Sequence, residues 1–513
     1  MGKYFQKLSD KKAMLFPISM CIMLFLYACI NALTLSCRES EFLLPFYFVG
    51  TFLICAFGAL AWMLHKNKIN NSTALIISAS VLGLCYLFLF PPVTVPDEQA
   101  HYLSAYRISN YMLFDFSSTK TEGMFMRECD LKFFETLLPN VDGEYIKSIY
   151  GDANFIAGST KNVWYECSFV GNAPFSYLLS AFGITMARIL HLGPLVTIVL
   201  GRVMNLVGFT ALTVYAVKKM PAGRNILLMI AGLPIVLHLS ASFSYDSITL
   251  GFTFVFISQV LYIKEKDSYA TIKDFIILAA FAMLLAPSKL VYFPIVLLVF
   301  VIPADKFKLS KRNSVILKML IVALALALLV ALQLSSVKTI SQSQTSGWTD
   351  EPPYNIKWIF TNLIESCKIF INTIITFAHF YIKNLFGGLL GWLNVDVPTY
   401  LWIPQMLLVL SGCIKYKNEK QIFQTGQKTW VWLCLIASTA LVMLSMFVAW
   451  TPMGSKIIYG VQGRYFLPLL LPLLLVLRCK RVALGEASEK YILTTYMAFG
   501  FATVINLFVT VTA

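Results

Sequence analysis

Two adjacent acids and a histidine stand in the segment VTVPDEQAHY, just beyond an apolar run that ends at Pro91 and Pro92. Asp97 and His101 are four residues apart, so on a helix they share one face, while Glu98 is turned away by roughly a quarter-turn. Such a face could hold a general base, with the second acid and the imidazole orienting the hydroxyl group that it deprotonates. We therefore take Asp97, Glu98 and His101 as candidate catalytic residues.

Two other interpretations of this segment stay open. Thr94, Pro96 and the acids resemble the start of a helix, where Asp97 and Glu98 would only cap the first turn. His101 could instead bind a metal ion, but one histidine and two acids come with no further cluster of ligands. The sequence assigns no metal site and no cofactor, and it leaves a role for a divalent cation open.

Three basic residues are expected near the same face of the membrane. They are Arg464 in GVQGRYFLPLLLP, Lys289 in APSKLVYFP and Arg202 in LGRVMNLVGF. Cations at membrane depth are costly and are retained where they bind anions, although each of these could also reach towards lipid headgroups. Together with the acids, they predict an anionic, lipid-borne substrate whose phosphate contacts Lys289, Arg464 and Arg202.

The composition predicts a polytopic membrane protein. Of 513 residues, 58% are hydrophobic and only 13% are charged, and the mean hydropathy is +0.72, which excludes a water-soluble globule. The 41 basic residues exceed the 26 acidic ones, but they fall in short clusters between apolar runs. This pattern indicates loops held on the cytoplasmic side rather than a surface for nucleic acid, so we expect no nucleic-acid partner.

The basic clusters also predict the topology. Lysines at the N-terminus place it in the cytoplasm, and crossings near 14–35, 43–64 and 73–91 bring the acidic motif to the exterior. We expect 225–243 and 247–263 to form an outward hairpin, and 274–303 to form two short helices that break near Pro287. Segments within 173–192 and 357–395 are expected to lie on the surface or to be re-entrant. The total is about thirteen membrane helices.

This topology divides the chain into five parts. Residues 1–91 are N-terminal membrane helices, 92–195 a large external loop with surface helices and the acidic motif, and 196–335 central membrane helices. Residues 336–397 form a second external or re-entrant region, and 398–513 are C-terminal membrane helices. Cys129 and Cys167 both fall in the first external loop, where a disulfide and two free thiols are alternatives.

The stretches PPVTVPDEQAHY and GRYFLPLLLP, with APSKLVY between them, resemble the signatures of a family of bacterial polytopic membrane proteins described as a domain of unknown function. That family is similar to the GT-C superfamily of membrane glycosyltransferases, which includes protein O-mannosyltransferases and the lipid A aminoarabinose transferase. The resemblance covers about residues 70 to 478, although only these short motifs are specific.

The resemblance implies a GT-C-like all-α fold and an inverting transferase in the cell envelope. The enzyme would move a sugar from a polyprenyl-phosphate carrier to a glycan, a cell-wall polymer or another hydroxyl acceptor at the outer membrane face. Asp97 would act as base with Glu98 positioning it, and Lys289 and Arg464 would neutralise the departing lipid phosphate. GT-C enzymes carry the acid after their first helix, whereas here it follows the third apolar run. Either two helices precede the shared module, or the equivalence is looser.

Two competing functions remain. A polysaccharide polymerase or ligase would use external cations against polyprenyl pyrophosphate without needing Asp97 as a base. A transporter or flippase of a lipid-linked substrate would need ionisable residues deep in the crossings and paired, broken helices. The break at Pro287 is of that kind, but interior charges are few and no paired halves are evident in the sequence.

Overall fold

The structure, a computed structural model, describes residues 2–116, 123–151, 154–156, 158–167, 174–342, 346–347, 349–416, 419 and 422–512. The side chains of 2–13, 335–342, 479–482 and 486–487 lie outside that description. Within it, nine helices are long and apolar enough to cross a membrane. They are α1 (Gly2–Cys37), α2 (Leu43–His65), α3 (Asn71–Leu89), α8 (Pro194–Lys219), α11 (Tyr245–Glu265), α14 (Lys311–Gln342), α16 (Leu363–Leu385), α18 (Thr425–Ala449) and α20 (Glu486–Thr512).

Shorter helices complete the chain. They are α4 (Glu98–Met112), α5 (Glu128–Glu135), α6 (Gly143–Ile149), α7 (Leu178–Ile189), α9 (Arg224–Ala231), α10 (Pro234–Ser240), α12 (Ile272–Ser288), α13 (Phe293–Val296), α15 (Ile356–Thr361), α17 (Thr399–Leu410) and α19 (Leu467–Leu477), with 3-10 turns η3 (Pro174–Tyr177), η4 (Leu290–Tyr292), η5 (Leu297–Val301), η6 (Ala304–Phe307), η7 (Ser411–Cys413) and η8 (Gly463–Phe466). The protein is thus mostly helical, as expected of an all-α membrane protein. The count of about thirteen crossings stays a prediction.

Three small two-stranded sheets accompany the helices. β1 (Gly123–Arg127) pairs antiparallel with β2 (Asn162–Glu166), and β3 (Leu389–Leu390) pairs antiparallel with β4 (Val395–Asp396). β5 (Ile414–Tyr416) pairs parallel with β6 (Cys479–Leu484).

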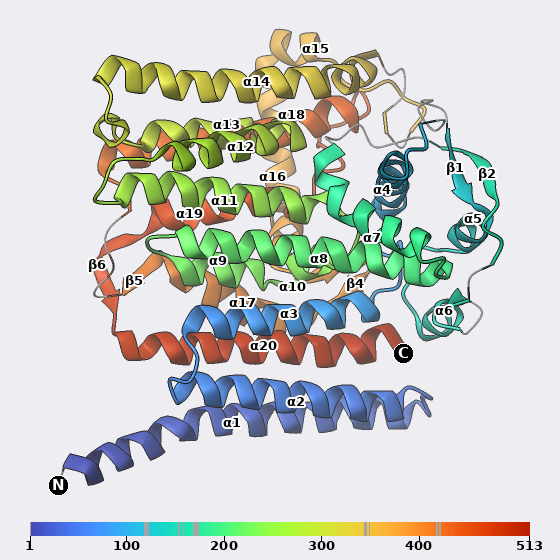
Figure 1. Cartoon of the computed structure of the whole chain (residues 1–513), viewed down its shortest axis with the longest axis vertical. Helices are drawn as coiled ribbons and strands as arrows, with labels where there is room; N and C mark the ends of the chain where they lie inside the picture. The colour runs from blue at the N-terminus through green and yellow to red at the C-terminus, as the bar shows by residue number, and fades with distance from the viewer. Residues whose placement is uncertain are drawn as a thin grey trace.

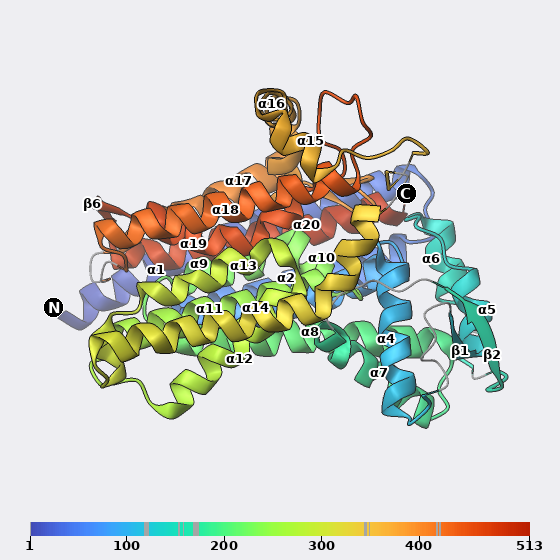
Figure 2. The same cartoon turned by 90° about the horizontal axis from the view of Figure 1, so that it is seen from above.

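Most of the long helices run side by side in one direction, as Figures 1 and 2 show. Helix α11 is the most enclosed of the candidate spans, with 89% of its apolar window buried, and it packs between α8 and α12. Helices α4 and α16 instead cross this direction. Helix α16 lies within 357–395, where a surface or re-entrant element is predicted. Its length and composition place it among the candidate spans, so that element stays a prediction.

The two ends of the bundle differ in content. Helices α4 to α7 and the β1–β2 pair gather at the end where the C-terminus lies, and β5, β6 and the N-terminus lie at the other end (Figure 1). The segment predicted as the first external loop therefore folds as one group of short elements. Which end faces the cell exterior rests on the pattern of basic residues and stays a prediction.

Two apolar runs are broken by proline. The run expected as one crossing at 225–243 is divided into α9 and α10, because Pro234 begins a new helix just after Gly232. The run 274–303 breaks where predicted: α12 ends at Ser288, next to Pro287, and the chain continues as η4, α13 and η5. Lys289 lies at this break.

The loop region has its own apolar core beside that of the bundle. Tyr102, Met124 and Phe133 belong to this second cluster, which joins α4, β1 and α5. Cys129 and Cys167 are both free thiols, so of the two alternatives the structure shows the unbonded one.

Candidate functional site

Asp97 occupies a strained position at the start of α4. It is the N-cap residue, with φ of 66°, yet its side chain makes no capping hydrogen bond. Val93, four residues earlier, also has a positive φ of 62°, and a β-branched residue is rarely found there. Each such residue costs about 1–3 kcal/mol, and strain of this kind clusters at functional sites. The Asp97 side chain is 54% exposed, so its carboxylate is available to a substrate.

Arg464 contacts this exposed carboxylate, although its own side chain is buried. Its Nη2 lies 3.1 Å from Oδ2 of Asp97, while the arginine side chain is only 3% exposed. The backbone N–H of Arg464 donates to Oδ1 of Asn384 at 2.9 Å. Gly463 allows this approach, since a Cβ there would meet the carbonyl oxygen of Tyr381 at 2.1 Å. Nη1 of Arg464 is buried and has no hydrogen-bond partner among the described residues, which is unusual for a buried guanidinium.

Lys289 reaches the same place from the break after α12. Its Nζ lies 2.9 Å from Oδ1 of Asp246, and Oδ2 of Asp246 lies 3.8 Å from Nε of Arg464. The ammonium also sits 5.1 Å from the ring centre of Tyr245 and 4.3 Å from that of Tyr465. Asp97, Arg464, Asp246 and Lys289 therefore form one chain of alternating charges.

His101 lies beside this chain on α4. It is 4% exposed, its Nδ1 is 2.9 Å from the hydroxyl of Tyr177, and its ring meets that of Tyr245 edge to face. Burial lowers the pKa of His101 to about 4, against the opposing charges of Asp246 and Asp97. The imidazole is therefore neutral at pH 7. It can orient hydroxyl groups but carries no charge for a phosphate.

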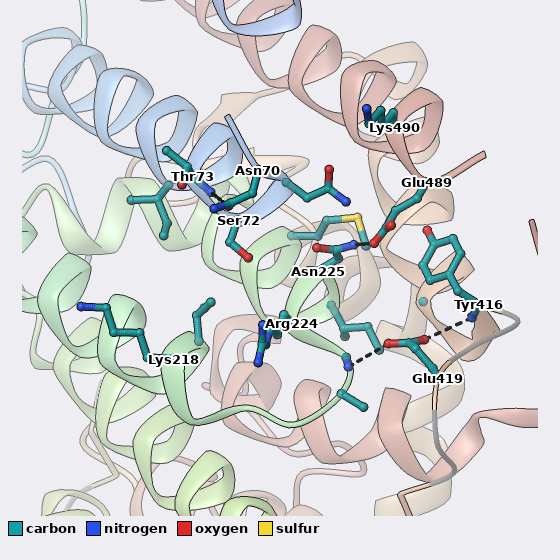
Figure 3. Close-up of a pocket in the computed structure, with 18 of the residues that line it drawn as sticks. Asn70, Ser72, Thr73, Lys218, Arg224, Asn225, Tyr416, Glu419, Glu489 and Lys490 are labelled. Atoms are coloured by element: carbon teal, nitrogen blue, oxygen red, sulfur yellow. Dashed lines mark hydrogen bonds between the residues drawn. The ribbon is translucent and has the colours of Figure 1, made fainter. Parts of the chain in front are cut away.

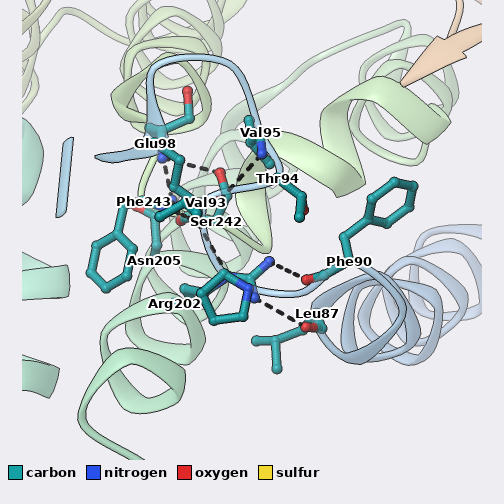
Figure 4. A network of polar contacts seen from close by, with 12 residues as sticks. Leu87, Phe90, Val93, Thr94, Val95, Glu98, Arg202, Asn205, Ser242 and Phe243 are labelled. Atoms are coloured by element: carbon teal, nitrogen blue, oxygen red, sulfur yellow. Dashed lines mark hydrogen bonds and ion pairs between the residues drawn. The ribbon is translucent and has the colours of Figure 1, made fainter. Parts of the chain in front are cut away.

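Glu98 and Arg202, the other two predicted charged residues, form a buried ion pair with each other (Figure 4). Nε of Arg202 lies 3.3 Å from Oε1 of Glu98, and both side chains are fully buried. The guanidinium also donates to the carbonyl oxygens of Leu87 at 3.3 Å and Phe90 at 2.8 Å. Oε1 of Glu98 accepts from the N–H of Phe243 at 3.0 Å. We therefore assign this pair a structural role rather than catalysis or phosphate binding.

The structure thus brings together Asp97, His101, Lys289 and Arg464 from the predicted set and separates Glu98 and Arg202 from them. It adds Asp246, which the sequence places at the tip of the predicted hairpin without a role. A lone acid in the first turn of an apolar helix, in FSYDSITLGF, was the available signal. Tyr177 and Tyr245 carry no such signal, because aromatic residues are common throughout the chain.

A resident metal ion does not fit this arrangement. Across the described residues, no group of three or more His, Cys, Asp and Glu side chains could hold a metal ion. Asp97 and Asp246 instead face Arg464 and Lys289.

A family model described as "Predicted membrane protein (DUF2142)" matches residues 80–473, which is more than half of the chain. The chain belongs to the DUF2142 family. No curated protein and no solved structure matches it.

The DUF2142 match contains the whole candidate site. It begins within α3 and ends within α19, so Asp97, Asp246, Lys289 and Arg464 lie inside it, while α1 and α2 lie outside. The four charges come from four separate parts of the matched region. All four charges therefore come from the part of this chain that the family model covers.

The buried pair predicts a large loss of stability when one partner is removed. Arg202→Met should lower the free energy of unfolding by about 3–5 kcal/mol, because Glu98 would remain buried without its cation. The double variant Arg202→Met/Glu98→Gln should recover much of the loss. Thermal unfolding in detergent measures both. Lys383→Met is the control, since its partner Asp396 is exposed and such pairs contribute at most about 1 kcal/mol. Equal losses at the two pairs would contradict the structural role.

His101 predicts how stability depends on pH. An unfolded histidine has a pKa near 6.5, and burial lowers that of His101 to about 4 in the folded protein. The unfolded chain therefore binds the proton more readily, and folded stability is lost as the pH falls from about 6.5 towards 4. His101→Gln should reduce this loss, measured as melting temperature between pH 7.5 and 4.5. His191→Gln, at an exposed histidine, should keep the wild-type profile, and an unchanged profile for His101→Gln would refute the assignment.

Proposed function

We propose that this protein is a membrane glycosyltransferase. It moves a sugar from a polyprenyl-phosphate carrier to a cell-surface glycan, a cell-wall polymer or another hydroxyl acceptor at the outer face of the membrane, with inversion. One observation carries the proposal: an exposed, strained carboxylate, Asp97, is paired with a buried arginine, Arg464, whose Nη1 has no hydrogen-bond partner in the described part of the chain. An exposed base beside buried cations is the arrangement that hydroxyl attack on a phosphate-linked sugar requires.

The charges fit each part of the reaction. Asp97 accepts the proton of the acceptor hydroxyl as its oxygen attacks the anomeric carbon. The bond from that carbon to the phosphate oxygen breaks, and the lipid phosphate leaves with the electron pair. Arg464 and Lys289 bind the negative charge that grows on the phosphate, and they do so best where burial excludes water.

Asp246 acts as a positioning residue in this proposal. It contacts Lys289 at 2.9 Å and Arg464 at 3.8 Å, so it holds both cations in the absence of substrate. Two acids then balance two cations. A donor phosphate adds negative charge, competes for Arg464 and frees Asp97 to act as base. In this proposal His101 orients the acceptor hydroxyl without contributing charge, and its own ring is held by the hydroxyl of Tyr177.

The resemblance to GT-C enzymes supports the same assignment. Those enzymes use an acid in the first external loop, a place that Asp97 would take here. The family match begins within α3, which supports the view that α1 and α2 precede a shared module. In this proposal the protein is a multi-pass protein of the cell membrane, with the N-terminus in the cytoplasm and the acidic motif outside. Its partners are the lipid-linked donor, the acceptor glycan and membrane lipids.

Asp97→Asn should abolish transfer while insertion and folding are retained, because the side chain is exposed and makes no capping hydrogen bond. General bases contribute about 10²–10⁴-fold to rate, so a loss of at least about 100-fold is expected. The measurement is the cell-surface glycan of a strain that lacks the protein, complemented by wild type or variant at matched expression.

Asp396→Asn is the matched control for Asp97→Asn, since Asp396 is also an exposed acid paired with a basic residue. It should restore the missing sugar substituent fully. Full restoration by Asp97→Asn would refute the general base and favour a polymerase or ligase that uses only the cations. An unchanged glycan in the deletion strain would favour a transporter or flippase.

Lys289→Ala should mainly weaken use of the donor, because a charge-assisted hydrogen bond to phosphate is lost. An increase in KM for the polyprenyl-phosphate sugar of about ten- to hundredfold is expected in membranes. The double variant Lys289→Ala/Asp246→Asn separates two roles of the lysine. If Lys289 only balances Asp246, the double variant recovers donor use; if Lys289 binds phosphate, it stays impaired. Arg464→Ala is tested in the same assay, and an unchanged KM would remove either residue from the phosphate site.

A further inference from the structure

A large polar cavity lies at the end of the bundle opposite Asp97. Its volume is about 1030 Å³, at the upper limit of the range for sites that bind small organic molecules. Residues from the α2–α3 connection, the end of α8, the start of α9 and the start of α20 line it, together with β5 (Figure 3). Ser72 of α3 and Arg224 of α9 point into the space between their helices. None of these residues belongs to the candidate active site.

The cavity has an excess of positive charge. Five basic side chains line it against two acidic ones; the basic ones are Lys68, Lys218, Arg224, Arg478 and Lys490, and the acidic ones are Glu419 and Glu489.

Both acids already have partners. Glu419 accepts from Nη2 of Arg478 at 2.6 Å and from the backbone N–H of Gly223 at 3.1 Å, and Glu489 accepts from Asn225. Among the described residues, no ion pair joins Lys218 or Arg224 to a carboxylate, and both side chains are exposed. The available charge in the cavity is therefore cationic.

The start of α9 adds a second feature that attracts anions. Gly223 is its N-cap, with φ of 79°, and no side chain caps the helix. The N–H of Gly223 already donates to Glu419, so the donors left at this end are the N–H groups of the first helical turn, where the helix dipole also favours negative charge. Arg478 also lines the cavity; it is 7% exposed, and its Nη1 has no hydrogen-bond partner among the described residues. Cavity, charge and helix end thus favour the same ligand chemistry.

We propose that this cavity binds a phosphate-bearing anion, either a soluble phosphate compound or the headgroup of an anionic lipid. Arg224 and Lys218 provide the charge at the opening, and the α9 N-terminus provides the backbone donors. This site would be distinct from the proposed glycosyltransferase site and would face the cytoplasm in the predicted topology. It does not depend on the proposed transfer reaction.

Binding to the full-length protein in nanodiscs tests this inference. The soluble source is tested with inorganic phosphate by calorimetry in nanodiscs of phosphatidylcholine. The lipid source is tested by native mass spectrometry of protein purified from mixed phosphatidylglycerol and phosphatidylcholine. The variant is Lys218→Ala/Arg224→Ala, whose exposed side chains can be removed without opening the core. The control is Lys311→Ala/Arg312→Ala, which removes the same charge from two exposed residues at the start of α14 outside the cavity.

The wild type and the α14 control should bind at least one of the two probes, and the cavity variant should bind it at least tenfold more weakly. Phosphate binding would identify a soluble ligand, and selective retention of phosphatidylglycerol would identify a lipid headgroup. Absence of both from the wild type, or an equal loss in the two double variants, would overturn the proposal. None of these outcomes depends on glycosyl transfer.

Discussion

Glu98 and Arg202 join four parts of the chain, which are the end of α3, the start of α4, α8 and the residues just before α11. Arg202 of α8 binds the carbonyl oxygens at the end of α3, and Glu98 at the start of α4 binds the N–H of Phe243 just before α11. Burying two charges costs several kcal/mol each, and the pair's attraction does not reliably exceed that cost. The pair is therefore better understood as a device that fixes positions. Asp97 is the residue immediately before Glu98, and Asp246 lies three residues after Phe243. The pair therefore fixes the backbone next to both acids.

The fixed positions explain why neighbouring acids have different environments. Glu98 is enclosed, and its burial raises the pKa of its carboxyl group while Arg202 and the Phe243 amide oppose that rise. Asp97, one residue earlier, is half exposed and contacts Arg464 instead of Arg202. The backbone achieves this divergence through the left-handed conformation of Asp97. Two acids that are adjacent in the sequence thus have separate tasks, one in packing and one in presenting charge.

Part of this site could be predicted from the sequence. Asp97, Lys289 and Arg464 stood at the ends of apolar runs that the basic clusters assign to one side of the membrane, and the structure brings them into one charge chain. Helical spacing could not show which acid is buried, because that depends on Arg202, more than a hundred residues away. In the sequence, Arg202 resembles Lys289 and Arg464, because all three are single basic residues near the ends of apolar runs. Asp246 could not be separated from an acid that caps its own helix.

The prediction of the fold from the sequence was limited for similar reasons. The three apolar runs before the acidic motif and the break at Pro287 follow from composition and proline chemistry, and the structure has both. The division of α9 from α10 was missed because a glycine and a proline within an apolar run are compatible with one kinked crossing. Loops leave no periodic signal, so the small core formed by α4, β1 and α5 could only be seen once it was assembled.

The geometry of Asp97 argues against a purely structural role for this residue. An aspartate at an N-cap normally accepts a backbone hydrogen bond, which stabilises a helix by about 1 kcal/mol. Here the side chain of Asp97 makes no such hydrogen bond, and its backbone has a strained conformation as well. A structural requirement would be met at lower cost by a capping conformation or by glycine, which tolerates positive φ. The interaction gained is the contact with Arg464, whose Nη1 finds no hydrogen-bond partner among the residues that the structure describes. A carboxylate kept exposed at that cost, beside a buried cation with spare donor capacity, is best explained by a ligand that binds both.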